Sequence, residues 1–268
     1  YRNYIFNGHF DYLYDKVGLY DTLRSLTCGN NSATAIQYQW QNLSGIEKNM
    51  LNFLENHDEQ RIASDFFAGN GAKSIPAMII SACMNTNPVM IYFGQEFGEP
   101  GMDSEGFSGC DGRTTIFDYW SVSSIRRWRN KDKFDGKNLS DEEKKLQSFY
   151  RTLLNLCNTE KAIRNGEFFD LTYANLEGCS FNEHKQYAFL RKCDKDLILI
   201  VVNFDEAPAT PQIKIPAHAF EYLGIPEKKS YKTKELLTNK TDNISISPDQ
   251  SVQVSLDGYG GILLKISL

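Results

Sequence analysis

Short apolar runs that end abruptly in polar residues dominate the first hundred positions. Residues 50–54 form one run, and the ionisable stretch Glu55–Arg61 follows it at once. A run with so little alternation predicts a strand that is buried on both faces, as in a parallel sheet. Residues 88–93 form a second such run, which ends in Gly94-Gln95-Glu96. Polar side chains at the carboxyl ends of buried parallel strands are typical of a catalytic edge.

Helical patterns separate these runs. Residues 10–16 alternate well enough for a first strand, and the helical segments are 19–29, 32–41 and 73–84. The order strand, helix, strand, helix, strand predicts parallel strands with right-handed crossovers. About three strands are visible, whereas a closed barrel of this class needs eight. We therefore predict an α/β fold in which residues 1–165 form part of a (β/α)8 TIM barrel.

The pattern changes after residue 165. Ser140 and Glu143 are spaced as a capping box, which opens a helix that ends near Gly166. Beyond it the period is two, and residues 187–191 with 197–203, and 251–256 with 262–268, read as two hairpins. Residues 166–268 are therefore predicted to form an all-β antiparallel sandwich domain.

Composition narrows the function classes. A formal net charge of −5 and the lack of a basic run argue against a nucleic-acid partner. No apolar run has membrane length. The six cysteines include no C-x-x-C pair, so a zinc site is not expected, and cysteines without an evident pairing favour the cytoplasm. Aromatic residues make up 13% of the chain; core packing explains most of them, and stacking on sugar rings is the functional alternative.

Two carboxylates follow neighbouring predicted strands, Asp58 after the first run and Glu96 after the second. Two carboxylates at one sheet edge are typical of a glycoside hydrolase, in which one acts as the general acid and the other as the nucleophile. A carboxylate at a strand end can equally be held in a structural ion pair. Position alone leaves these two interpretations of Asp58 open.

The motifs themselves resemble a known family. FLENHDEQR resembles the Asn-His-Asp motif at the end of barrel strand seven in the α-amylase family (glycoside hydrolase family 13). PVMIYFGQEFG is similar to the strand-eight segment of that family, and DGRTTIFDYW to the loop before its last barrel helix. The predicted sandwich resembles the family's C-terminal β-domain, so the resemblance runs along nearly the whole chain.

The resemblance implies roles for four residues. Asp58 matches the carboxylate that stabilises the transition state of a retaining hydrolase, and His57 matches the histidine that binds hydroxyls of the glucose ring. Asn56 and Arg61 complete the predicted substrate-binding group. We expect these two residues to position the loop that carries His57 and Asp58. Glu96 is then a structural residue, and the expected substrate is an α-1,4-linked glucan.

Two motifs of the family have no match here. The nucleophilic aspartate of strand four and the acid/base glutamate of strand five are absent, so the resemblance covers about strands six to eight and the β-domain. We therefore expect the chain to be inactive alone and either to self-associate or to pair with an N-terminal half. No metal or cofactor is expected in this chain; calcium would belong to that other half. The alternative function is a non-catalytic carbohydrate-binding or interaction subunit of amylase fold.

Overall fold

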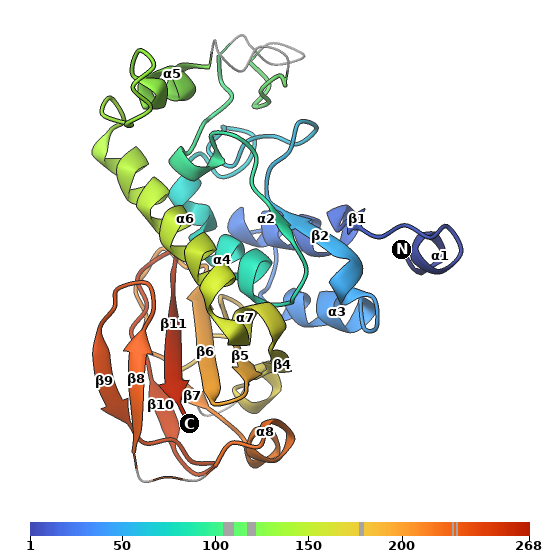
Figure 1. The fold of residues 1–268 in the computed structure, drawn as a ribbon, viewed down its shortest axis with the longest axis vertical. Helices are drawn as coiled ribbons and strands as arrows, with labels where there is room; N and C mark the ends of the chain where they lie inside the picture. Colours follow the sequence, from blue (N-terminus) through green and yellow to red (C-terminus); the bar gives the residue numbers. More distant parts are fainter. Residues whose placement is uncertain (104–109, 117–121, 177–179, 227, 229) are drawn as a thin grey trace.

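A three-stranded parallel sheet forms the first part of the molecule (Figure 1). The computed structural model describes residues 1–103, 110–116, 122–176, 180–226, 228 and 230–268. The strands are β1 (Leu13–Tyr14), β2 (Met50–Phe53) and β3 (Val89–Met90), in the order β1-β2-β3. The helices around them are α1 (Arg2–Phe6), α2 (Asp21–Thr27), α3 (Thr34–Asn42) and α4 (Ile75–Cys83), with short turns at Lys16–Tyr20, Glu47–Asn49, Gly71–Ser74 and Gln95–Phe97. The predicted parallel pairing is confirmed.

The strands are shorter than predicted, and β2 shows why. Its ladder stops at Phe53, although the apolar run continues to Leu54. Beyond it, Glu55 accepts a hydrogen bond from the Ile62 backbone N–H, and Asn56 accepts one from the Asp58 N–H. Short polar side chains that bind the backbone compete with strand pairing, so they turn the chain here.

Three helices lead to the second part: α5 (Ser123–Arg129), α6 (Asp141–Thr159) and α7 (Lys161–Asn165). The predicted capping box is present, because Ser140 Oγ accepts from the Glu143 N–H at 3.1 Å and Glu143 Oε2 accepts from the Ser140 N–H at 2.6 Å. The helix predicted to reach Gly166 is broken at Glu160, whose backbone is extended. The Glu160 carboxylate pairs with Lys265 at 2.7 Å and so ties this break to the last strand.

The second part holds a six-stranded antiparallel sheet in the order β4-β5-β6-β11-β8-β9 and a two-stranded sheet, β10-β7. The strands are β4 (Glu167–Asp170), β5 (Gln186–Cys193), β6 (Asp196–Asn203), β7 (Gln212–Lys214), β8 (Tyr231–Glu235), β9 (Thr241–Ile244), β10 (Ser251–Gln253) and β11 (Gly260–Ser267), with α8 (Ala217–Leu223) between β7 and β8. The change from helices to antiparallel strands falls between α7 and β4, at the predicted boundary. The division into domains 1–165 and 166–268 stays a prediction.

Of the two predicted hairpins, the first is confirmed and the second is wrong. β5 and β6 pair along their whole length around a two-residue turn at Asp194-Lys195. β10, however, pairs with β7, whereas β11 pairs with β6 and β8. The intervening chain crosses from one sheet to the other, with Leu256 bridging Ala209 and the Tyr259 N–H donating to the Asp205 carbonyl.

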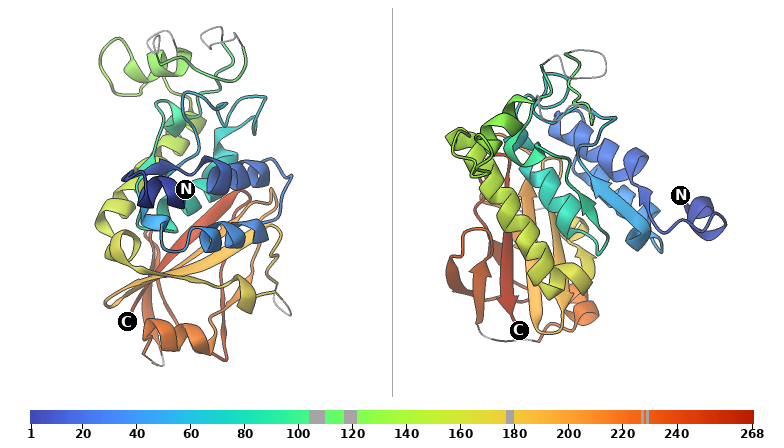
Figure 2. Two further views of the ribbon diagram at one scale, coloured as in Figure 1. Left: turned by 90° about the vertical axis from the view of Figure 1, so that its right-hand side faces the viewer. Right: turned by 45° about the horizontal axis from the view of Figure 1, so that its top comes forward.

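The central strands of the large sheet are buried on both faces. On β6, alternate residues 198, 200 and 202 join one apolar cluster, and residues 197, 199 and 201 join another. The first cluster also contains side chains of α2, α4 and α6, and these helices lie between the three-stranded and the six-stranded sheet (Figure 2). The second cluster belongs to the antiparallel part. The two parts of the chain therefore share one continuous core.

Arg191 joins the parts at a single buried point. Its guanidinium donates to the backbone carbonyls of Met84, Ala162, Ile163 and Gly166. The residue is 1% exposed. Burial lowers the pKa of Arg191 to about 10, which leaves it charged at neutral pH. These carbonyls lie at the ends of α4 and α7, where the helix dipole favours a cation.

Replacing this side chain should cost stability. We expect Arg191→Met to lower the free energy of unfolding by about 3 kcal/mol, because buried carbonyls lose their donors. Urea denaturation followed by circular dichroism measures the change. Arg151→Met, at an exposed position on α6, is the control and should change stability by less than about 0.5 kcal/mol. Equal stability of the two variants would contradict the role of Arg191.

Candidate active site

The turn that follows β2 carries the candidate residues. Asn56 is 7% exposed, and its Oδ1 accepts hydrogen bonds of 2.9 Å from the N–H groups of both Asp58 and Glu59. This amide oxygen closes the turn from inside, which is the usual way an asparagine fixes a local bend. Asn56 therefore shapes the backbone and turns its side chain away from solvent.

His57 and Asp58 lie on the outside of the same turn. Their side chains are 44% and 73% exposed, and His57 Nε2 lies 3.5 Å from Asp58 Oδ2. Both groups stand at the carboxyl end of β2, where the sequence predicted them. The structure thus brings a carboxylate and an imidazole together on an open surface.

Contacts from other elements hold the Asp58 carbonyl and the next residue, Glu59. Arg113 Nε donates to the Asp58 carbonyl at 2.7 Å, and the same guanidinium pairs with Asp111 at 3.0 Å. On the other side, Glu59 Oε2 accepts from Tyr20 Oη at 3.0 Å and lies 3.3 Å from Arg24. The Asp58 carboxylate is free to meet a ligand, whereas its peptide unit is fixed.

Arg61 occupies a different place from the one predicted for a substrate-binding side chain. It is 0% exposed, and its guanidinium binds Glu55 at 2.6 Å, the Phe93 carbonyl at 2.7 Å and Thr114 Oγ1. Its charge also lies 4.2 Å from the centre of the Tyr92 ring. Protein groups enclose Arg61, which joins the ends of β2 and β3 to the 112–114 segment. These contacts agree with a residue that positions the loop, and its part in substrate binding stays a prediction.

The carboxylate that pairs with Arg61 belongs to Glu55, which is also buried. Burial raises the pKa of Glu55, while the Arg61 guanidinium and the Ile62 N–H act in the opposite direction. A buried ion pair of this kind keeps its geometry because each charge is costly without the other. Glu55 thus anchors the turn from below.

Glu96 and Glu99 follow β3 but face inward. Burial raises the pKa of Glu96, whose carboxylate lies near backbone N–H groups of its own turn. Glu99 is fully buried and accepts hydrogen bonds from the Gly101 N–H and Ser124 Oγ. Neither residue is hydrogen-bonded to Asp58 in the described part of the chain, and the structural role of Glu96 stays a prediction.

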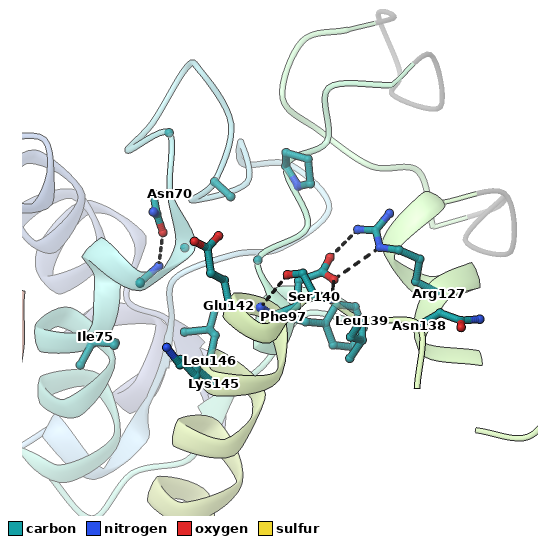
Figure 3. Close-up of a pocket in the computed structure, with 17 residues that line it drawn as sticks. Asn70, Ile75, Phe97, Arg127, Asn138, Leu139, Ser140, Glu142, Lys145 and Leu146 are labelled. Carbon is teal, nitrogen blue, oxygen red and sulfur yellow. Dashed lines mark hydrogen bonds and ion pairs between the residues drawn. The ribbon is translucent and has the colours of Figure 1, made fainter. Parts of the chain in front are cut away.

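A hollow of about 1010 Å³ lies beside this region, between residues 63–75 and the start of α6 (Figure 3). Its floor is apolar, with Phe97, Leu139 and Leu146, and the Arg127–Glu143 ion pair closes one end. None of the four candidate residues lines it. The exposed pair His57 and Asp58 therefore defines the candidate site, and this hollow is separate from it.

The described residues contain no group of three or more His, Cys, Asp or Glu side chains that could hold a metal ion. None of the helices in the described ranges is long and apolar enough to cross a membrane. The five described cysteines, Cys28, Cys83, Cys110, Cys157 and Cys193, are free thiols.

Comparison with known proteins decides the family. The model of the α-amylase catalytic domain matches residues 21–165, just over half of the chain, and this range includes the Asp58 turn. The chain belongs to the α-amylase family. The members of this family that the comparison identifies are glycoside hydrolases of the α-amylase type.

One curated relative is a cyclomaltodextrinase from a Bacillus species, 27% identical over 175 residues. The match covers 65% of this chain and 25% of the relative. Among solved structures, a maltogenic α-amylase from Thermotoga neapolitana matches 99% of this chain and 52% of its own, with a TM-score of 0.65 and 17% identity. An α-amylase from Geobacillus thermoleovorans matches 93% of this chain and 47% of its own, with a TM-score of 0.60 and 14% identity. The chain thus spans about half the length of these structures and shares their fold.

Sequence reasoning found the turn but missed the residues that hold it. Arg113, Thr114 and Tyr20 come from segments far from Asp58 in the sequence, and no local pattern links them to it. The one available signal was the resemblance of DGRTTIFDYW to a family loop, which contains Arg113 and Thr114. Residues 117–120 of that motif lie outside the described part.

Proposed function

We propose that this chain is the C-terminal part of an α-amylase-type hydrolase that cleaves α-1,4-linked glucans with retention of configuration. In this proposal β1, β2 and β3 correspond to about strands six to eight of a (β/α)8 barrel. The observation that carries it is the Asp58 carboxylate, exposed at a strand end on a backbone that Arg113 and Glu59 hold in place. The names of the relatives, a cyclomaltodextrinase and a maltogenic α-amylase, support a glucan as substrate.

The chemistry follows from one negative charge in a fixed position. Cleavage of a glycosidic bond builds positive charge on the sugar ring, and a pre-positioned carboxylate stabilises that charge more than it stabilises the ground state. His57 donates a hydrogen bond to a ring hydroxyl, and its 3.5 Å contact with Asp58 orients both groups. Asn56 and Arg61 position this pair from inside the protein.

The proposal assigns the nucleophile and the general acid to another part of the same enzyme, because a retaining mechanism needs two further carboxyl groups. In a protein that contains them, β1 is the strand next to which the preceding half packs. The exposed side chains Tyr12 and Tyr14 (55% and 44%) along this strand support pairing there, with the other half or with a second copy. The 268-residue chain alone is then inactive.

The test uses maltoheptaose and two proteins, the 268-residue chain and a polypeptide that also carries the preceding half. We expect the longer polypeptide to release products of the α-anomer first, observed by proton NMR before mutarotation, and the shorter one to release none. Release of the β-anomer would refute retention. Binding of maltoheptaose by the longer polypeptide without cleavage would favour the non-catalytic alternative.

A further inference from the structure

Two hollows meet at Tyr222, on α8. The first, of about 350 Å³, reaches from Trp40 and Asn85 to Tyr222, and the second, of about 620 Å³, reaches from Tyr222 to Asp194. Asn165 and Glu167 also line both. The two hollows therefore adjoin along these three residues, and we call them together the Tyr222 groove.

The groove lies at the opposite end of the parallel strands from Asp58. Its wall includes Glu47, just before β2, and Thr86, just before β3. These positions mark the amino ends of the two strands, whereas the Asp58 turn follows the carboxyl end of β2. A ligand in the groove would thus be separated from the proposed catalytic residue by the length of the sheet.

The Tyr222 ring is both exposed and held in place. It is 58% exposed, and its hydroxyl donates to Glu167 Oε2 at 3.1 Å. The ring centre lies 5.8 Å from that of Phe169 and 6.3 Å from that of His218. The hydrogen bond to Glu167 raises the pKa of Tyr222, so the hydroxyl stays a donor at neutral pH. An exposed aromatic face that is already oriented costs little conformational entropy on binding.

Polar groups and a second ring surround this face. Trp40 is half-buried and fixed by a 3.1 Å hydrogen bond from Nε1 to Asp170. Glu47, a half-buried residue just before β2, also lines the groove.

The charged residues of the lining nearly balance, with a small acidic excess. The carboxylates of Glu47, Glu167 and Asp194 line the groove, against Lys192 and Arg191. Arg191 is already committed to four backbone carbonyls. The remaining lining offers acceptors and amides to hydroxyl groups, together with apolar ring faces, and this combination fits a neutral, polyhydroxylated chain.

We propose that the Tyr222 groove is a second carbohydrate site, which binds a segment of an α-glucan by stacking a pyranose face on Tyr222. The sugar hydroxyls are received by Asn165 and Glu167, which line both hollows. The choice of an α-glucan rests on the proposed function, whereas the binding of a neutral sugar rests on the groove itself. Such a site would hold the enzyme on a long substrate without taking part in the cleavage.

The test is titration of the 268-residue chain with maltoheptaose, followed by isothermal calorimetry. We expect Tyr222→Ala to weaken the affinity at least about tenfold, and Tyr222→Phe, which keeps the ring, to weaken it clearly less. Tyr38→Ala removes a tyrosine of similar exposure (65%) that lines neither hollow, and it should bind as the wild type does. Equal melting temperatures of the variants exclude misfolding as the cause.

The outcomes separate this inference from the proposed function. Equal affinity in wild type and Tyr222→Ala, or no binding at all, would overturn the groove site even if the longer polypeptide cleaves maltoheptaose through Asp58. Tyr222-dependent binding with no cleavage by that polypeptide would leave the groove standing and refute the proposed activity. Stronger binding of cellohexaose than of maltoheptaose would overturn the α-glucan assignment.

Discussion

Asp58→Asn lowers kcat for maltoheptaose by about a thousandfold in the polypeptide that contains the preceding half, with a much smaller change in KM. This is the expected result if the carboxylate acts mainly in the transition state, because an amide of the same shape loses the charge but keeps the contacts. The initial rate of reducing-end formation measures it. Asp65→Asn, at an exposed position in the segment that follows, is the matched control and should retain wild-type rates.

The same substitution should leave the fold intact. The Asp58 side chain is 73% exposed, and an exposed carboxylate near one histidine contributes little to stability. A change below about 0.5 kcal/mol in the free energy of unfolding is therefore expected. Wild-type activity in a folded Asp58→Asn protein would refute the proposed role of this carboxylate.

Arg61→Met should have the largest effect on stability. We expect it to lower the free energy of unfolding by about 3–5 kcal/mol, because the Glu55 carboxylate is then left buried without its partner. The Thr114 hydroxyl and the Phe93 carbonyl lose their donor as well. Urea denaturation of the 268-residue chain measures the loss.

A second substitution tests the cause. The double variant Arg61→Met with Glu55→Leu removes both charges, so it should recover most of the stability that the single variant loses. Arg129→Met breaks an exposed ion pair with Asp132, whose side chains are 43% and 65% exposed, and it should cost less than about 1 kcal/mol. The interpretation fails if Arg61→Met costs no more than this surface control.

The sequence predicts those structural features that depend on residues close to one another along the chain. The apolar run before Glu55 and the turn residues after it predicted both a buried parallel strand and its polar end. The spacing of Ser140 and Glu143 predicted a capping box for the same reason. Arg61 shows the limit, because its burial depends on the 112–114 segment and on Phe93, and nothing in the local pattern shows that these approach it.

Strand partners were the other limit. Alternation along residues 251–268 correctly indicates extended chain. A period of two, however, carries no information on which strand pairs with it in the sheet. The glycine-rich stretch 257–261 lies between residues 251–256 and 262–268, and its composition favours the turn of a hairpin. In the structure residues 257–259 belong to a connection between sheets, whereas Gly260 and Gly261 begin β11. The pairing of β10 with β7 depends on a segment some forty residues earlier.

The doubly buried sheet limits how this protein can be rearranged. If the chain were divided after α7, Phe189, Ile198 and Ile200 would lose the α4 and α6 side chains that cover them and would meet water. Large apolar surfaces of that kind promote aggregation. The β-rich portion is consequently no detachable module. Its transplantation to another protein would require α4 and α6 as well, and expression trials of either portion alone should yield insoluble material.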